Sequence, residues 1–162
     1  MSPLQWSAPF EDLRVGQTFA TPARTVTEAD VVAFADLTGD HHPQHSDVAW
    51  AARSPFGERI AHGMLIVSYA VGLVPLDPAR VLALRRLRDV VFKRPVGFGD
   101  TISVEGKVEQ LRWVSDEAGL VSCRWSILNQ RGELCARAAV EVLWCSGQSA
   151  ATLPTAAAGS LS

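Results

Sequence analysis

The stretch HGMLIVSYAVGLV, residues 62–74, decides the fold because apolar residues occupy nearly every side of the helix that it predicts. A helix without a polar face must be buried on all sides, since no surface is left for water. At 1.5 Å per residue this helix is about 20 Å long. The sequence therefore predicts one central helix around which the rest of the chain packs.

Four long runs rich in β-branched and aromatic residues follow this helix. They cover residues 81–96, 101–114, 119–130 and 132–144. Turn sequences SDEAG (115–119) and NQRG (129–132) join neighbouring runs, which predicts antiparallel pairing. The chain is thus expected to be an α+β protein whose antiparallel sheet wraps around the central helix.

Smaller elements are predicted before the central helix. Residues 17–26 favour an edge strand that Pro22 interrupts. Thr27 and Asp30 form a capping-box pattern at the start of an amphipathic helix, and Gly39 is expected to end that helix as a left-handed cap.

Length and composition favour a single globular domain. We expect an irregular arm over residues 1–10, one domain over 11–146 and a disordered tail over 147–162. The net charge of −2 gives no support for a nucleic-acid or membrane partner. A single sheet exposes an edge strand, so a homodimer or higher homo-oligomer is expected.

Three cysteines and the start of the chain bear on the compartment. Cys123, Cys135 and Cys145 are odd in number, form no CxxC pair and lie in apolar runs, which indicates buried thiols in a reducing compartment. The first residues lack the pattern of a secretory signal. The protein is therefore expected to be cytoplasmic.

The stretch GDHHPQHSD, residues 39–47, holds three of the four histidines, and His62 follows within IAHGML. Such a cluster can be a metal site, an acid–base site or a polar loop. His41 and His45 have the i,i+4 spacing of helical zinc ligands, but that arrangement needs a helix through Pro43, which the proline ring opposes. No metal site is predicted, and Ser46 or Asp47 is expected to cap a short helix after this loop.

Three motifs together resemble the MaoC-like hydratases of the hotdog-fold superfamily, with the (R)-specific enoyl-CoA hydratases as the nearest members. The motifs are FADLTGDHHPQHSD, FGERIAHGML and KRPVGFGDTI, and the resemblance covers residues 11–145. It implies a single hotdog fold. It also implies reversible addition of water to a trans-2-enoyl thioester of CoA or an acyl carrier, giving an (R)-3-hydroxyacyl thioester without a metal or redox cofactor.

The resemblance places the family's catalytic Asp-x4-His pair on Asp40 and His45. The family's glycine, whose backbone N–H receives the thioester oxygen, falls on Gly63. His42 stands where many relatives carry asparagine, and Val71 stands where some relatives carry a serine that lines the site. Both departures concern the wall of the site, and therefore substrate preference more than reaction class.

The chemistry of hydration fits these residues independently. A base must take a proton from water, an acid must protonate Cα, and a donor must stabilise the enolate oxygen. A carboxylate and an imidazole near each other can hold one water and exchange its protons. Gly63 begins the central helix, where free N–H groups point outward and the missing side chain lets an oxygen approach. Which of Asp40 and His45 is the base stays open.

Further residues are expected at the substrate, each with an alternative role. They are His42, His62, Trp50, Phe56, Val71, Lys93 and Arg94. The aromatic pair could line an acyl pocket or pack in the core, and the basic pair could meet CoA phosphates or form a solvated strand face. His62 could order the loop instead of touching substrate.

Two alternatives to a hydratase remain at this stage. One is an acyl-CoA thioesterase, which hotdog folds also support. The other is a non-catalytic acyl-binding subunit of a hotdog heteromer. The sequence does not define the acyl chain length or the carrier.

Overall fold

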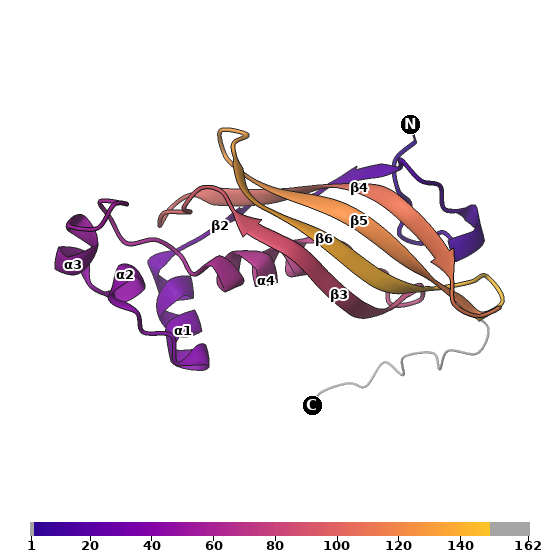
Figure 1. Ribbon diagram of the computed structural model, residues 1–162, viewed down its shortest axis with the longest axis horizontal. Helices are drawn as coiled ribbons and strands as arrows, with labels where there is room; N and C mark the ends of the chain where they lie inside the picture. Colours follow the sequence, from indigo (N-terminus) through magenta and orange to yellow (C-terminus); the bar gives the residue numbers. More distant parts are fainter. Residues whose placement is uncertain (1, 150–162) are drawn as a thin grey trace, which may run out of the picture.

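A six-stranded antiparallel sheet curves around helix α4 (Gly63–Leu73) in the computed structural model of the chain, which describes residues 2–149 (Figure 1). The strands are β1 (Thr18–Ala20), β2 (Arg24–Thr25), β3 (Val81–Phe92), β4 (Thr101–Trp113), β5 (Ala118–Asn129) and β6 (Leu134–Cys145). They follow the order β1-β4-β5-β6-β3, and β2 also pairs with β4. The predicted α+β class and the sheet wrapped around a helix are confirmed.

Helices α1 (Glu28–Thr38), α2 (Pro43–Ser46) and α3 (Val48–Ala52) lie together at one end of the sheet (Figure 1). The short 3-10 helix η1 (Phe10–Asp12) lies near the other end. The α1–α3 segment carries the histidine-rich loop. The topology therefore brings this loop to the N-terminal end of α4.

Both predicted hairpins are present. β4 pairs with β5 around the 115–119 turn, and β5 pairs with β6 around the 129–132 turn, in antiparallel register along their length. The interrupted strand at 17–26 is confirmed as β1 and β2, which both pair with β4 and are separated by Pro22 and its neighbours.

The helix caps predicted from the sequence are also present in the structure. The Thr27 hydroxyl accepts from the Asp30 N–H at 3.1 Å, while the Asp30 carboxylate accepts from the Thr27 N–H at 2.9 Å. Gly39 ends α1 with a left-handed φ of 79°. Asp47 caps α3 through the Trp50 N–H at 2.8 Å. Because these signals depend on neighbouring residues only, they are readable without tertiary information.

Helix α4 is less buried than its sequence predicts. Leu65, Ile66, Val67 and Ala70 face the sheet, but Met64 on the opposite side is 53% exposed. Ser68 and Gly72, one and two turns further on, are also exposed. The prediction of burial on all sides is therefore wrong for one chain. The physical reason is that β3 ends the sheet, so within residues 2–149 no further strand covers this face.

Residues of the N-terminal arm pack on the sheet. Leu4 and Phe10 are buried, and Trp6 stacks on Trp144 with ring centroids 5.4 Å apart.

Of the tail predicted for 147–162, residues from 150 on lie outside the described residues. Across residues 2–149 no helix is long and apolar enough to cross a membrane.

The three cysteines are buried and unpaired, as expected.

Candidate active site

A cavity of about 400 Å³ lies where the histidine-rich loop meets the N-terminus of α4 and the end of β3. Asp40, His45 and Gly63, predicted as the catalytic residues, all line it. Apolar side chains supply most of the remaining wall, among them Phe56, Ile60, Met64 and Phe92. The cavity thus combines a small polar cluster with an apolar chamber, as ligand sites commonly do.

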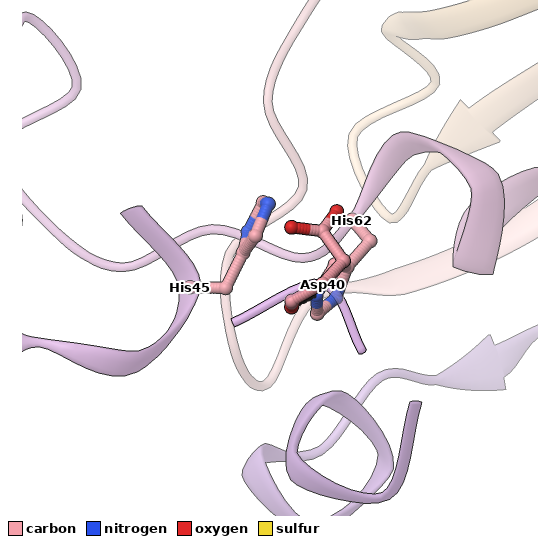
Figure 2. Close-up of side chains that lie close together, drawn as sticks. All are labelled: Asp40, His45 and His62. Atoms are coloured by element: carbon pink, nitrogen blue, oxygen red, sulfur yellow. Dashed lines mark hydrogen bonds between the residues drawn. The ribbon is translucent and has the colours of Figure 1, made fainter. Parts of the chain in front are cut away.

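The polar cluster consists of Asp40, His45 and His62. Each offers one polar atom, a ring nitrogen or a carboxylate oxygen, and these three atoms lie within 4.8 Å of one another. Figure 2 shows the Asp40 carboxylate beside the His45 ring, with His62 next to Asp40. The Asp-x4-His spacing therefore brings its two side chains together, as the sequence predicts.

His45 is held in one tautomer. Its Nδ1 lies 2.6 Å from the carbonyl oxygen of Ile60, and because a carbonyl only accepts, Nδ1 carries the proton and donates it. In the neutral ring, Nε2 is then a free acceptor. Burial lowers the pKa of His45, and this outweighs the opposing effects of the Ile60 hydrogen bond and the Asp40 charge. His45 therefore presents a neutral, basic Nε2 near neutral pH.

Asp40 is an exposed residue with few protein contacts. One carboxylate oxygen accepts from the His42 N–H at 3.3 Å, and the Asp40 N–H donates to the Thr38 hydroxyl at 3.2 Å. The first bond orients the carboxylate, and the second holds the backbone of Asp40. The carboxylate thus keeps free acceptor positions for a water shared with His45.

His62 is 2% exposed and contacts both of the other residues of the cluster. Its Nε2 donates to the Asp40 carbonyl oxygen at 2.9 Å, and its ring stacks on His45 with centroids 3.8 Å apart. Its Nδ1 is buried without a hydrogen-bond partner among the described residues. His62 therefore contacts both members of the pair, the backbone of Asp40 and the ring of His45.

Two ring nitrogens of the cluster are already engaged, because His45 Nδ1 and His62 Nε2 both bond to backbone carbonyls. The other two nitrogens, His45 Nε2 and His62 Nδ1, belong to rings stacked at 29°. A metal ion bound with these carbonyl bonds intact would have to use those two nitrogens and the Asp40 carboxylate.

Gly63 is the first residue of α4, and no side chain caps this helix terminus. Its N–H is among those that have no partner within the helix. A Cβ at this position would lie 2.6 Å from a Phe92 ring carbon, so the ring rests directly against the glycine. The positive end of the helix dipole and the absent side chain together suit an approaching oxyanion.

Four of the seven residues expected at the substrate line the cavity, namely Phe56, His62, Lys93 and Arg94. The structure does not place His42, Trp50 or Val71 on its wall. The His42 ring caps α2 by accepting from the Gln44 N–H, and Trp50 packs edge-on against it with centroids 5.3 Å apart. Val71 lies about 12 Å beyond Gly63 along the helix axis, too far to share its cavity.

Sequence reasoning missed Ile60, Phe92 and Cys135, which also line the cavity. Ile60 acts through its backbone carbonyl, and a backbone contact leaves no sequence signal. Burial raises the pKa of the Cys135 thiol, so this cysteine stays protonated and is a poor nucleophile toward a bound thioester.

A family model described as MaoC like domain matches residues 11–122 of the chain. A relative from Aeromonas caviae named (R)-specific enoyl-CoA hydratase is 33% identical over 124 residues, which cover 76% of this chain and 90% of that protein. Two further relatives match at 46% and 39% identity, but the chain spans only 29% and 64% of their respective lengths.

Solved structures agree with this likeness. A MaoC-like dehydratase from Rhodospirillum rubrum superposes with a TM-score of 0.77 at 27% identity, covering 86% of this chain and 98% of that one. A Mycobacterium tuberculosis protein with a double hotdog fold has a TM-score of 0.77 at 24% identity, covering 88% and 45% of the two chains. The latter likeness shows the fold alone, which is a single hotdog domain here.

Proposed function

Because the chain belongs to the MaoC-like domain family, we propose that it is a hydratase acting on trans-2-enoyl thioesters of CoA or an acyl carrier. The product is the (R)-3-hydroxyacyl thioester, and the reaction runs in both directions without a metal or redox cofactor. The observation that carries this proposal is the Asp40–His45 pair, which shares one cavity with the free N–H end of α4.

The contacts of the site support one order of proton transfers. His45 Nε2 takes a proton from a water held between it and Asp40, and the water oxygen forms a bond to Cβ. The π electrons of the double bond move onto the thioester, whose oxygen becomes an enolate beside the Gly63 N–H. Cα then takes a proton from the imidazolium, which restores His45. Such acid–base transfer is worth about 10²–10⁴-fold in rate.

Purified protein mixed with crotonyl-CoA tests this proposal. We expect the absorbance of the conjugated double bond to fall to an equilibrium value, with no release of free CoA thiol. A thioesterase would release thiol from both unsaturated and saturated acyl-CoA. An acyl-binding subunit would change neither signal, so each alternative gives its own result.

The acid limb of the pH–rate profile is expected to report His45. A base must be deprotonated, so kcat/KM should fall as pH drops through the pKa of His45 in the free enzyme. Since burial lowers that pKa, the midpoint of the acid limb should lie below the ordinary histidine value of about 6.5. Initial rates between pH 4.5 and 8 at low substrate concentration measure it. A midpoint at or above the ordinary value would oppose this role for His45.

We propose further that the protein is a homodimer. Met64, on the exposed side of α4, lines the same cavity as Phe92 at the end of the edge strand β3. Leu82, Leu84 and Phe92 of that strand are 45%, 42% and 50% exposed. An edge strand with apolar side chains is a site for pairing with another chain. Light scattering should give twice the chain mass of 17.5 kDa. A monomer would contradict the dimer, and activity only with a second, different hotdog chain would favour a heteromer.

A further inference from the structure

The catalytic His45 lies on a helix too short to hold itself in place. Helix α2 has four residues, and its second residue Gln44 is 7% exposed, which is unusual for a polar side chain. A buried amide must find hydrogen-bond partners, so its contacts show what it holds.

Besides the Gln44 N–H, which donates to the His42 ring, two bonds of Gln44 lead to the segment that contacts His45. The Gln44 side-chain Nε2 donates to the Glu58 carbonyl at 3.0 Å, and the Gln44 main-chain carbonyl accepts from the Ile60 N–H at 3.2 Å. The next residue completes the set, because His45 Nδ1 donates to the Ile60 carbonyl at 2.6 Å. Only the first of these bonds depends on the identity of residue 44.

We propose that Gln44 is a positioning residue that holds the 58–60 segment against α2 and thereby keeps the Ile60 carbonyl on His45 Nδ1. Through that bond it fixes the tautomer in which Nε2 is free to accept a proton. The inference rests on the proposed function only where it concerns the reaction rate, because the tautomer of His45 is a property of the free protein.

Loss of this amide bond has a defined consequence. Without it, the Ile60 carbonyl is held by the main-chain bond alone, and the Nδ1–H and Nε2–H forms of His45 become closer in energy. Each molecule with the proton on Nε2 presents a donor where the reaction needs an acceptor. A small displacement of an acid–base group lowers the rate strongly, so a loss of kcat is expected with little change in KM.

The test compares Gln44→Met with Gln17→Met. Methionine keeps the length of glutamine but removes the N–H donor. Gln17 is a matched control because it is 8% exposed and its amide oxygen accepts from the Arg14 N–H at 2.9 Å, near the start of β1 and away from the cavity. Both variants replace a buried glutamine with methionine, so their thermal melting temperatures show whether the two substitutions lower stability equally.

The wild-type protein and both variants are compared by nitrogen-15 NMR of the histidine rings and by steady-state kinetics with crotonyl-CoA. We expect Gln44→Met to shift His45 from the Nδ1–H form toward a mixture of tautomers and to lower kcat about 10-fold. Gln17→Met should leave both unchanged. An unaltered His45 tautomer in Gln44→Met would overturn the inference, as would equal losses in the two variants. If no protein hydrates crotonyl-CoA, the proposed function fails, while the NMR result still decides the role of Gln44.

Discussion

Asp40→Asn is expected to lower kcat for crotonyl-CoA hydration by about 10³-fold, within the range of general acid–base catalysis. Asparagine keeps the carbonyl oxygen that accepts from the His42 N–H, so the loop should retain its shape. It removes the negative charge that orients the water and stabilises a protonated His45. His45→Asn should give a loss of similar size. The double variant should lose little more than either single one, because the two groups act on one water.

Asp36→Asn provides the matched control for this result. Asp36 lies on α1 close to the same loop and pairs with His41 at 3.6 Å, but it is exposed and does not line the cavity. Its replacement should leave kcat unchanged. Full activity in Asp40→Asn would exclude the acid–base role, and an equal loss in Asp36→Asn would point to a general effect of loop charge.

The second large effect is expected at Gly63, whose backbone N–H is proposed to receive the thioester oxygen and whose lack of a side chain leaves room for the Phe92 ring. Gly63→Ala alone would test them together, because the new Cβ would lie 2.6–2.9 Å from three Phe92 ring carbons and push the ring into the cavity. A Phe92→Ala background removes this clash. Within it, Gly63→Ala keeps the N–H, whereas Gly63→Pro removes it.

Proline suits this position structurally. It is favoured at the first residue of a helix, and His62 before it already has the extended backbone that proline demands, with φ −59° and ψ 134°. We expect Gly63→Ala and the background alone to have similar kcat, and Gly63→Pro to be slower by about 10²–10³-fold, the usual loss for one oxyanion donor. Equal rates for the alanine and proline variants would show that this N–H does not serve the reaction.

Local sequence patterns predict much of this fold. The capping box at Thr27, the left-handed Gly39 and the two hairpin turns depend on adjacent residues, and the α4 run is apolar enough to identify the centre of the domain. The proximity of Asp40 and His45, the proposed catalytic pair, follows from spacing on one loop. Each of these features is encoded within a few residues of chain.

Other parts of the site depend on contacts between distant segments. Phe92 reaches Gly63 because β3 pairs with β6 and carries a register shift between Arg88 and Val91, where Asp89 adopts a left-handed φ of 52°. Nothing in the local pattern separates Phe92 from its apolar neighbours. Val71 is not among the residues that line the cavity for a related reason, since the sequence of a mostly apolar helix does not show which turn faces the cavity.

The exposed face of α4 is a second feature that the local sequence does not predict. Its apolar sequence correctly indicates a helix that avoids water, but one chain covers only the side that faces the sheet. A second copy placed against β3 and Met64 would complete the burial that the sequence predicts. The discrepancy between sequence and single chain is thus what supports the proposed dimer.

The most direct test of the central claim follows the oxygen of water. Crotonyl-CoA is incubated with the protein in H₂¹⁸O, and the products are analysed by mass spectrometry and chiral chromatography. Hydration at the Asp40–His45 site predicts 3-hydroxybutyryl-CoA with one ¹⁸O at C3 and the (R) configuration. Label in a free carboxylate together with CoA thiol would mean hydrolysis of the thioester, and would contradict the account.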